Sequence, residues 1–443
     1  MDLVGMDEFY DVVVVGTGVA GLYCALSLPS RYRVLLLSKE KADESDSFLA
    51  QGGICMQRGE DDYRPYFDDT MRAGHYESDR EAVDLMIRSS NMIIRDLIRR
   101  GVRFERDRAG ALCFTREGAH SRARILFHED VTGKEIAQTL LDAVCRCPNI
   151  ELREGVTLLD FFHDANACGG VIVSGTDENP YSSGGEEDGE PRVIGAGAVV
   201  LACGGIGGLY EHSTNFPHIT GDAIAMALRH GVACEHLDYV QIHPTTLYSG
   251  GPGRRFLISE SVRGEGAVLL DRDGRRFIDE LQPRDVVSAA IRRQMEKDGT
   301  AHVWEDMRPL GEDVLRQHFP NISRHCEEAG YDPLREPVPV VPAQHYFMGG
   351  IKVDLSGRTN LPRLYACGET CCNGVHGRNR LASNSLLESL VFAQRAADDI
   401  MFAEPPDFRG NRPDVAPYRE KEALFAAYRD EVRRAVGGIG AST

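Results

Sequence analysis

The sequence lacks an excess of basic residues, a long apolar run and a secretory signal. Its 443 residues carry 50 lysines and arginines against 68 aspartates and glutamates, which gives a formal net charge of −18. Phosphate binding requires a basic surface, so this balance argues against a nucleic-acid partner. No apolar run approaches the roughly 20 residues that span a bilayer, and the acidic start has no signal-peptide pattern. We therefore expect a cytoplasmic protein without a membrane or nucleic-acid partner.

The sequence also lacks CxxC pairs, although it contains 12 cysteines. Cysteines of a cytoplasmic protein are expected to be reduced thiols. Without CxxC pairs, neither a zinc knuckle nor a thioredoxin-type site is indicated. The one cluster, Cys367, Cys371 and Cys372, lies beside glycines, where small buried cysteines are common. We expect no metal site.

A glycine-rich turn between a strand and a helix is the first feature that is present. Residues 11–15 form a β-branched run and residues 34–38 a second buried strand, with a helical pattern between them. Gly16, Gly18 and Gly21 fit the pattern GxGxxG. In that pattern two glycines let the backbone approach a pyrophosphate at the helix N-terminus, and the third allows close helix packing. The unit predicts a Rossmann-like dinucleotide site.

The end of the second strand departs from the NAD-binding pattern. An acid is expected there for the ribose hydroxyls, but Ser38 and Lys39 occupy the place. This disfavours NAD as the primary ligand and leaves room for FAD held by other segments.

Three later segments offer groups that suit a flavin. Gly52 and Gly53 offer successive backbone N–H groups, and Glu369 follows a strand, where a carboxylate can bind hydroxyl groups. Ser385 and Leu386 begin a helix whose positive end suits the anionic edge of a reduced ring. Each segment alone is explained equally well by an ordinary turn.

The composition changes along the chain, and this predicts an interrupted domain. Residues 237–346 are richer in proline and alternating charge and lack a glycine-rich nucleotide pattern. We predict an α/β fold in which a nucleotide-binding domain, residues 1–236 and 347–403, is interrupted by an α+β domain, residues 237–346. Residues 404–443 predict a short helical tail. The polar stretch at 174–192 predicts a surface excursion between strands.

Three helices are predicted to begin with capping boxes. One lies at about 78–100, with Ser78 and Glu81 in the box. Another begins at Thr132, with Glu135 in the box, and the third begins at Ser385, which pairs with Glu388 three residues later.

The stretch TREGAHSRAR, residues 115–124, places a single acid, Glu117, among basic side chains. These are Arg116, His120, Arg122 and Arg124. A ligand that carries both signs of charge would explain the mixture. A solvated loop would explain it as well, because charged residues are mostly exposed.

Motifs throughout the chain match those of a known flavoprotein family. In chain order they are AQGGI, QIHPTTLY, SVRGEGAVL, PRDVV, HYFMGGI, LYACGE and GRNRLASNSLLES. Over roughly residues 8–400 the chain resembles the flavoproteins of succinate dehydrogenase and fumarate reductase, and most closely the members that oxidise L-aspartate. The resemblance implies a discontinuous FAD-binding domain and a capping domain that closes over the substrate. It also implies a C-terminal helical bundle longer than the tail present here.

The resemblance implies that FAD is bound without a covalent link. Respiratory members attach FAD to a histidine five residues before the glutamine of AQGG, and Asp46 occupies that position here. The residues implied to hold FAD are Gly16, Thr17, Gly18, Val19, Ala20, Gly21, Ser38, Lys39, Asp46, Ser47, Phe48, Leu49, Ala50, Gln51, Gly52, Gly53, Asp222, Glu369, Ser385 and Leu386.

The resemblance also implies a substrate site. Glu117 would orient the amino group of aspartate, where respiratory members have a residue that is not acidic. The other implied substrate residues are Arg380 and His345 at one carboxylate, His243 and Ser259 at the other, and Gln241 and Glu260 along the pocket wall.

Arg284 is implied to donate or accept the substrate proton. This role is demanding, because the pKa of arginine lies above 12, and it would need an acid relay such as Glu260 with Arg263. The alternative is a structural salt bridge from Arg284 to Asp285 or Asp279.

The implied reaction is the oxidation of L-aspartate to iminoaspartate, with electrons passing through FAD to oxygen or fumarate. It would be the first step of de novo NAD biosynthesis, with iminoaspartate passed on to quinolinate synthase. The alternative is a soluble fumarate reductase or a succinate dehydrogenase-type flavoprotein. Glu117 argues against the first, and the missing attachment histidine argues against the second.

Overall fold

The apolar runs of the sequence form the longest sheet of the protein. The computed structural model describes residues 6–175, 189–248, 253–404 and 406–437. The strands of this sheet lie in the order β5 (Ile150–Arg153), β2 (Val34–Leu37), β1 (Glu8–Val15), β8 (Arg192–Leu201), β7 (Cys168–Gly175) and β6 (Val156–His163), and β17 (Leu364–Ala366) pairs with β8. Strands β5, β2, β1, β8 and β17 run parallel, whereas β7 is antiparallel to both of its neighbours, β8 and β6. The two predicted opening strands are adjacent and parallel, as a dinucleotide-binding unit requires.

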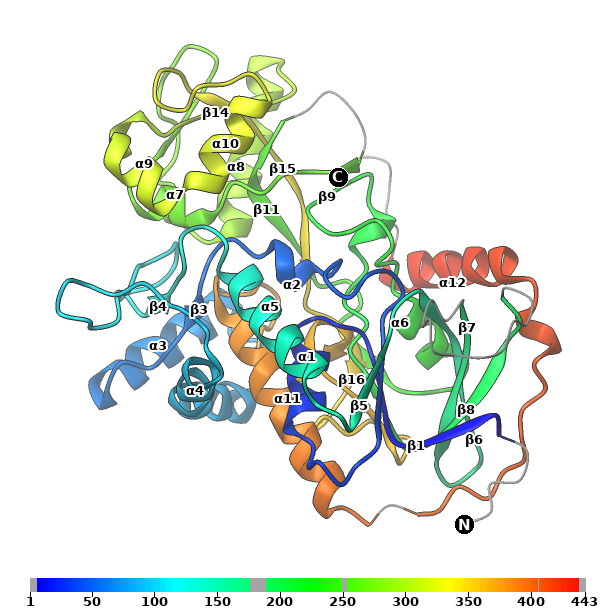
Figure 1. The fold of residues 1–443 in the computed structure, drawn as a ribbon. Helices are drawn as coiled ribbons and strands as arrows, with labels where there is room; N and C mark the ends of the chain where they lie inside the picture. The colour runs from blue at the N-terminus through cyan, green and yellow to red at the C-terminus, as the bar shows by residue number, and fades with distance from the viewer. Residues whose placement is uncertain (1–5, 176–188, 249–252, 405, 438–443) are drawn as a thin grey trace.

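Alternate residues of β1 face two different cores, because successive side chains of a strand point to opposite faces. Val12 and Val14 pack in a core with α1 (Val19–Ser27), α4 (Arg80–Arg100), α5 (Thr132–Cys145) and α11 (Asn384–Phe402). Val13 and Val15 pack in a core with α6 (Asp222–Arg229) and α12 (Lys421–Val436). Figure 1 shows α1, α5 and α11 on one side of the sheet and α6 with α12 on the other. Burial on both faces explains the continuous apolar run of β1.

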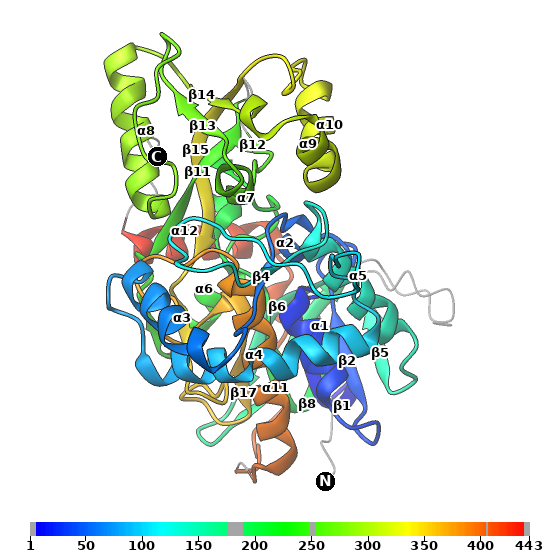
Figure 2. The same cartoon turned by 90° about the vertical axis from the view of Figure 1, so that its left-hand side faces the viewer.

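A second sheet lies above the first in Figures 1 and 2. Its strands lie in the order β12 (Gly253–Arg254), β9 (His212–Ser213), β15 (Val338–Phe347), β14 (Val303–Asp306) and β13 (Val268–Leu270), and β11 (Val240–Leu247) pairs with β15. Helices α7 (Glu260–Gly264), α8 (Arg284–Asp298), α9 (Glu312–His318) and α10 (Pro320–Glu328) surround a separate apolar core with it. We call this α+β region the capping part and the rest the lower part. Strand β9 joins the upper sheet from outside the span 237–346, whose boundaries stay a prediction.

The remaining elements are short or cover the lower part. They are α2 (Asp46–Leu49), β3 (Ile54–Cys55), α3 (Glu60–Ala73), β4 (Ile125–Leu126), β10 (Cys234–Glu235), β16 (Gly350–Lys352), β18 (Cys371–Cys372) and the 3-10 turns η1 (Gly207–Leu209), η2 (Arg308–Leu310), η3 (Gly368–Thr370) and η4 (Ala416–Tyr418). The predicted fold class, a Rossmann-like α/β domain interrupted by an α+β part and followed by a helical tail, is confirmed.

The capping box predicted at Ser78 is wrong. Helix α4 is capped by Asp79, whose Oδ1 accepts hydrogen bonds from the N–H groups of Glu81 and Ala82 at 2.8 and 2.9 Å. A carboxylate is the better acceptor at a positive helix end, so the next residue along takes the place of the serine.

The box predicted at Thr132 is wrong, because Thr132 is the first residue of α5 and its Oγ1 accepts the N–H of His128 at 3.0 Å. The box predicted at Ser385 is also wrong. Helix α11 begins one residue earlier, after Ser383, and the side chain of Ser383 does not cap it. Ser385 instead accepts a hydrogen bond from Arg380, and Glu388 accepts one from Asn373. Both side chains are engaged by buried tertiary partners, which a local pattern does not reveal.

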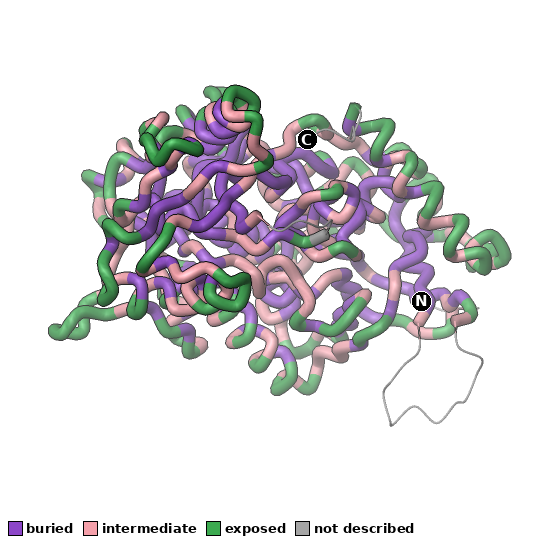
Figure 3. Tube along the Cα trace, turned by 90° about the horizontal axis from the view of Figure 1, so that it is seen from above, coloured by how far each residue is buried: buried purple, intermediate pink, exposed green. Residues whose placement is uncertain are grey.

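The C-terminal helix α12 packs against the lower part. Its residues Tyr428, Val432 and Val436 are buried, and the Tyr428 hydroxyl donates to the backbone oxygen of Leu159 at 2.8 Å. Figure 3 shows the buried core enclosed by exposed loops and turns. No helix in the described ranges is long and apolar enough to cross a membrane. Most of the polar stretch at 174–192, residues 176–188, lies outside the described residues.

Candidate active site

A cavity of about 500 Å³ lies where the lower and capping parts meet. The lower part contributes the glycine turn after β1, the segment 43–53 and the first turn of α11, and the capping part contributes side chains of β11, α7, α8 and β15. Of the residues predicted to bind cofactor or substrate, all except Gly21 and Gln241 line this cavity. The structure therefore gathers segments that are hundreds of residues apart in the chain.

The glycine turn leaves a helix N-terminus facing the cavity. Gly16 has a φ of 113°, and a side chain there would lie 2.0 Å from the backbone oxygen of Ala202. A side chain on Gly21 would lie 1.9 Å from the oxygen of Gly16, so α1 packs directly against the turn. The first N–H of α1, that of Val19, donates to Ser47 Oγ at 3.0 Å. This geometry suits a pyrophosphate at the N-terminus of α1.

The lysine at the end of β2 is already paired. Lys39 Nζ donates to Asp222 Oδ2 at 2.8 Å and lies 5.1 Å from the ring centre of Phe425 on α12. Next to it, Ser38 Oγ and Thr17 Oγ1 are hydrogen-bonded at 3.1 Å. Asp222 from α6 therefore brings a carboxylate to this region, where it pairs with Lys39.

One predicted donor at the flavin segment is not free. The N–H of Gly53 donates to Ser383 Oγ at 3.1 Å, so the prediction of two successive N–H groups aimed at a ligand is wrong for Gly53. The cause is the sharp backbone turn at Ser383, which has a φ of 62°. Gly52 and Leu386 line the cavity as predicted.

Two acids of the lower part line the cavity with raised pKa values. Asp46 Oδ1 accepts the N–H of Phe216 and Glu369 Oε1 accepts that of Phe347, both at 2.9 Å. Burial raises the pKa of Asp46 to about 7. Burial and the charge of Asp46 raise the pKa of Glu369 to about 8. A protonated carboxyl can donate as well as accept a hydrogen bond, which suits contacts with ribityl and ribose hydroxyls.

Arg284 of the capping part is fixed by two contacts at the cavity wall. Its Nε donates to Glu260 Oε2 at 2.6 Å and its Nη1 to Gln241 Oε1 at 2.9 Å. The alternative salt bridges do not form, because Asp285 and Asp279 bind other side chains. The guanidinium is therefore oriented for a role at the cavity.

Glu260 lies between two buried arginines. Its Oε2 atom is 3.9 Å from Arg263 Nη2, in addition to its bond with Arg284. Burial raises the pKa of Glu260, but the charges of Arg284 and Arg263 outweigh burial and hold it below the ordinary value. Glu260 is therefore a carboxylate, and the row Arg284–Glu260–Arg263 leads from the cavity into the capping part.

Gln241 connects Arg284 with Arg380, although it does not itself line the cavity. Its Oε1 accepts from Arg380 Nε at 3.3 Å, and its Nε2 donates to the backbone oxygen of Arg380 at 2.8 Å. The Arg380 guanidinium lies 4.1 Å from the ring centre of Tyr346. Burial and the charge of Arg284 lower the pKa of Arg380 to about 10, which still leaves it charged at neutral pH. Two guanidinium groups on the wall suit two carboxylates.

His243 and His345 stand edge to face in the cavity, with ring centres 5.0 Å apart. His345 Nδ1 and Thr214 Oγ1 are hydrogen-bonded at 2.7 Å, and His243 Nδ1 accepts the N–H of Thr245 at 3.2 Å. Burial, with the charge of Arg284, lowers the pKa of both histidines well below the ordinary value. Both are therefore neutral, and a neutral imidazole can donate one hydrogen bond to a carboxylate.

Glu117 lines the cavity and is bound by hydroxyl groups. Its Oε1 accepts from Ser261 Oγ and its Oε2 from Ser383 Oγ, both at 2.6 Å. The residue is 2% exposed, and burial, with the charge of Glu260, raises its pKa. No ion pair with Glu117 occurs in the described part of the chain. A positive group on a ligand would therefore meet an acid that is not already neutralised by a protein cation.

Two of the arginines near Glu117 in the sequence form ion pairs with other acids. Arg124 is wholly buried and pairs with Asp62 at 3.1 Å and Asp69 at 2.8 Å, and Arg122 forms an exposed ion pair. Within residues 115–124 only Glu117 lines the cavity. The solvated-loop interpretation is therefore wrong for the acid, and a ligand role is wrong for these arginines.

Sequence reasoning missed Ser261 and Ser383, the two hydroxyls that hold Glu117. Both lie inside motifs quoted above, SVRGEGAVL and GRNRLASNSLLES, and this was the available signal. Ser259, which was predicted, caps α7 by accepting the N–H of Ser261 at 3.2 Å.

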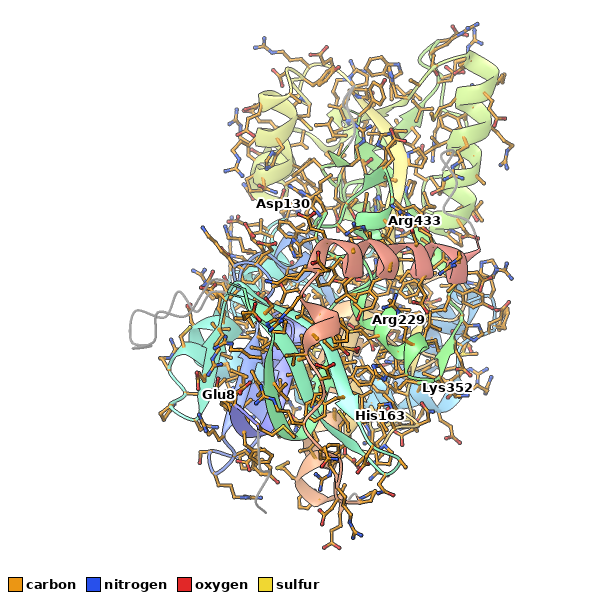
Figure 4. All side chains as sticks on the ribbon, turned by 90° about the vertical axis from the view of Figure 1, so that its right-hand side faces the viewer. Glu8, Asp130, His163, Arg229, Lys352 and Arg433 are labelled. Atoms are coloured by element: carbon orange, nitrogen blue, oxygen red, sulfur yellow. The ribbon has the colours of Figure 1, made fainter. Side chains whose placement is uncertain are left out.

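Asp130 is a second missed residue, and it joins the two parts of the protein. It is 1% exposed and accepts the N–H groups of Asn321 at 3.2 Å and Ile322 at 2.6 Å, at the start of α10. Figure 4 shows Asp130 at the boundary between the lower and capping parts. A carboxylate from one part thus satisfies free N–H groups of a helix in the other.

The lining fits FAD. The open N-terminus of α1 suits a pyrophosphate, Asp222 and Glu369 suit hydroxyl groups, and the first turn of α11 suits the edge of a flavin ring. The acid that NAD would need after β2 is replaced by Lys39, which pairs within the protein.

Comparison with known sequences places the chain among flavoproteins. The family model described as FAD binding domain matches residues 11–386. L-aspartate oxidase of Clostridium perfringens (strain 13 / Type A) is 46% identical over 396 residues, which cover 89% of this chain and 87% of that protein. L-aspartate oxidase of Nostoc sp. (strain PCC 7120 / SAG 25.82 / UTEX 2576) is 43% identical over 447 residues, covering 96% of this chain and 75% of that protein.

Comparison with solved structures gives the same fold. Quinol fumarate reductase FrdA of E. coli, in a mutant form, superposes with a TM-score of 0.81 at 30% sequence identity, covering 96% of this chain and 74% of that chain.

Proposed function

Because the chain belongs to the FAD-binding flavoprotein family that contains the L-aspartate oxidases, we propose that it oxidises L-aspartate to iminoaspartate. It is an FAD-dependent oxidoreductase. Bound FAD supplies a two-electron acceptor for the hydride that leaves the substrate. The observation that carries the choice of substrate is Glu117, an acid in a site otherwise built for carboxylates.

The two carboxylates of aspartate are bound by arginine and neutral histidine. Arg380 with His345 binds one carboxylate, and His243 with Ser259 binds the other. Support comes from their common position on the cavity wall and from the cost of burying an unpaired carboxylate. Gln241 holds the two guanidinium groups apart at a fixed spacing by accepting from both.

Glu117 binds the ammonium group of aspartate. Both of its oxygens accept hydroxyl hydrogen bonds, and an oxygen has a second lone pair with which to accept from an ammonium. Fumarate and succinate carry no ammonium, so they leave this acid unpaired. The site therefore favours the amino acid over the plain dicarboxylate.

Arg284 takes the proton that aspartate loses. Its Nε and Nη1 are engaged by Glu260 and Gln241, which leaves Nη2 for the substrate. A charged guanidinium has no site for another proton, so Arg284 gives a proton to the carboxylate of Glu260 as it receives the one that aspartate loses, which leaves Arg284 charged and Glu260 protonated.

The electron acceptor is oxygen or fumarate, and the protein acts in the cytoplasm. Iminoaspartate is an unstable imine, so it is passed to quinolinate synthase in the first stage of NAD biosynthesis. A soluble fumarate reductase is the second candidate, since a solved fumarate reductase shares the fold. Glu117 disfavours it.

The test is turnover of L-aspartate by the purified yellow protein. We expect peroxide under oxygen and succinate when fumarate replaces oxygen, and acid precipitation should release free FAD because Asp46 stands at the attachment position. Fumarate reduction without aspartate turnover would assign the protein to the second candidate. Flavin that remains on the precipitate would contradict non-covalent binding.

A further inference from the structure

A carboxylate of the capping part is held by the lower part directly beside Arg284. Asp285 follows Arg284 in the first turn of α8. Its Oδ2 accepts a hydrogen bond from His75 Nε2 at 3.1 Å, and its Oδ1 accepts a longer one from Asn379 Nδ2 at 3.4 Å. Both donors belong to the lower part, and Figure 2 shows α8 above α3, the helix that precedes His75. Both oxygens of Asp285 are therefore bound across the boundary between the two parts.

Asn379 connects Asp285 with the side chain that accepts from both guanidinium groups of the cavity wall. It is 5% exposed, and its Oδ1 accepts from Gln241 Nε2 at 2.8 Å. Gln241 in turn accepts from Arg284, and the peptide bond joins Arg284 to Asp285. The contacts therefore close a ring that runs from Arg284 through Gln241 and Asn379 to Asp285 and back to Arg284.

This ring fixes Arg284 at both ends. The bond to Gln241 orients the guanidinium, and the hold on Asp285 fixes the backbone from which the side chain of Arg284 starts. Asp285, Asn379 and His75 lie outside the lining of the cavity. A group that acts in catalysis has to stand close to its productive position, and a displacement of about 1 Å can lower a rate about a hundredfold. Contacts outside the cavity can therefore control the rate of a step inside it.

His75 reaches Asp285 from a strained turn. The φ angles of His75 and Tyr76 are 57° and 61°, so two successive residues other than glycine adopt the left-handed region. Such a conformation is costly and persists only where the surrounding structure enforces it. Here the N–H of Arg378 donates to the backbone oxygen of Gly74 at 3.2 Å, which ties the turn to the segment that carries Asn379. The two donors to Asp285 are thus held together by the lower part.

We propose that Asp285 is a positioning residue for the reaction, and that Asn379 and His75 act through it to hold Arg284 in place at the cavity. The inference rests on the proposed function, because Arg284 transfers the substrate proton in that function. Asp285 contributes no group to the cavity wall, so its loss should slow the proton step and leave the groups that bind aspartate in place.

The first test is Asp285→Ala, measured with L-aspartate. We expect kcat to fall about tenfold to a hundredfold, with KM changed less than about threefold because the groups that bind the substrate remain. Asp285→Asn keeps an acceptor oxygen in the same shape and should bring kcat back to within about threefold of the unchanged protein. The matched control is Asp298→Ala at the other end of α8, whose carboxylate accepts from Gln294 and Arg272 within the capping part and which should keep full activity.

A double-mutant cycle tests whether His75 acts through Asp285. His75→Asn keeps a residue that tolerates the left-handed region, but its side chain is too short to reach Asp285. Because both side chains are nearly half exposed, this variant should lower kcat only about two- to fivefold. In the Asp285→Ala background the same change should have no further effect.

The FAD content and melting temperature of each sample separate positioning from folding. The inference is overturned if Asp285→Ala keeps kcat within about twofold of the unchanged protein, or if the two changes in the cycle are additive. It is also overturned if kcat falls only in parallel with bound FAD or melting temperature, because Asp285 would then serve the fold alone. An unchanged protein that does not oxidise aspartate would refute the proposed function, and the inference would fall with it before any variant is compared.

Discussion

The lower and capping parts line the cavity with different kinds of chemical groups. In the lower part the wall combines backbone and small side chains, as at the turn of Gly16 and at Gly52, with separate ionisable side chains such as Asp46 and Glu369. In the capping part it is made of ionisable side chains, among them Arg284 and Glu260, that are buried and bound to one another. A wall of backbone holds a large cofactor by shape and hydrogen bonding, whereas a wall of buried charges supports the transfer of protons and hydride. Under the proposed function, the lower part holds the cofactor and contacts the substrate through Glu117 and Arg380, while the capping part supplies the side chains that transfer the proton.

The largest effect is expected when a charged side chain of the capping part is removed from the cavity wall. Arg284→Leu should lower aspartate turnover by about a thousandfold or more, because removal of one group that stabilises developing charge costs about 3–4 kcal/mol and loss of the proton carrier adds to it. Because Arg284 lies outside the lower part, the flavin absorbance of the purified variant should be unchanged. Steady-state kinetics with the FAD content measured on the same sample checks both statements. Near-normal turnover would assign the proton step to another residue.

The second prediction concerns the acid that both parts hold. Glu117→Gln should lower aspartate oxidation by at least about a hundredfold, since a desolvated charge pair that loses one partner costs on the order of 3–5 kcal/mol. Fumarate reduction by the reduced variant should be spared, because fumarate offers no ammonium. The ratio of the two activities is therefore the measurement. A parallel fall in both, with FAD still bound, would mean that Glu117 serves the joint between Ser261 and Ser383 and not substrate choice.

The sequence predicts the backbone features of the site better than its network of charged side chains. The glycine turn, the opening strands and the interrupted domain follow from local spacing, because a backbone site is encoded by consecutive residues. The charged network does not, because Glu260, Arg284 and Arg380 meet only after the chain has folded, and their roles came from the family resemblance. The helix cap predicted at Ser385 failed for the same reason. Ser385 looked like a local cap, but a buried arginine takes its hydroxyl.

A third prediction tests the joint between the parts. Asp130→Ala should weaken the closed arrangement by about 1 kcal/mol, as for loss of a helix-capping acceptor, and raise the KM for aspartate about fivefold with little change in kcat. Asp130→Asn keeps an acceptor oxygen and is the matched control.

The pH dependence of stability gives a second readout at Asp130. Burial raises the pKa of Asp130 to about 6, so its contribution to the stability of the folded protein is present below about pH 4 and is lost as pH rises through 6. Melting temperatures from pH 4 to 6.5 should accordingly fall less steeply in the alanine variant. An unchanged KM in Asp130→Ala would show that this contact does not hold the parts together.

The smallest effect is expected in the lower part. Unlike the Arg284 variant, a variant there should bind FAD more weakly but keep normal turnover of aspartate. Phe425 on α12 lies against Lys39, which pairs with Asp222 at the cavity wall, so the C-terminal helix steadies a side chain of the cofactor site. Phe425→Leu keeps the apolar packing and removes the ring, and a partly exposed cation–π contact contributes about 0.5–1 kcal/mol. The Kd for FAD, measured by titration of the apoprotein, should therefore rise about two- to fivefold, and Phe425→Tyr, which keeps an aromatic face, should change it less. With FAD at saturation, turnover of aspartate should be normal in both variants, because the charges of the capping wall are untouched. A variant whose turnover stays low at saturating FAD would show that the lower part also shapes the chemistry, and the division between the two walls would then fail.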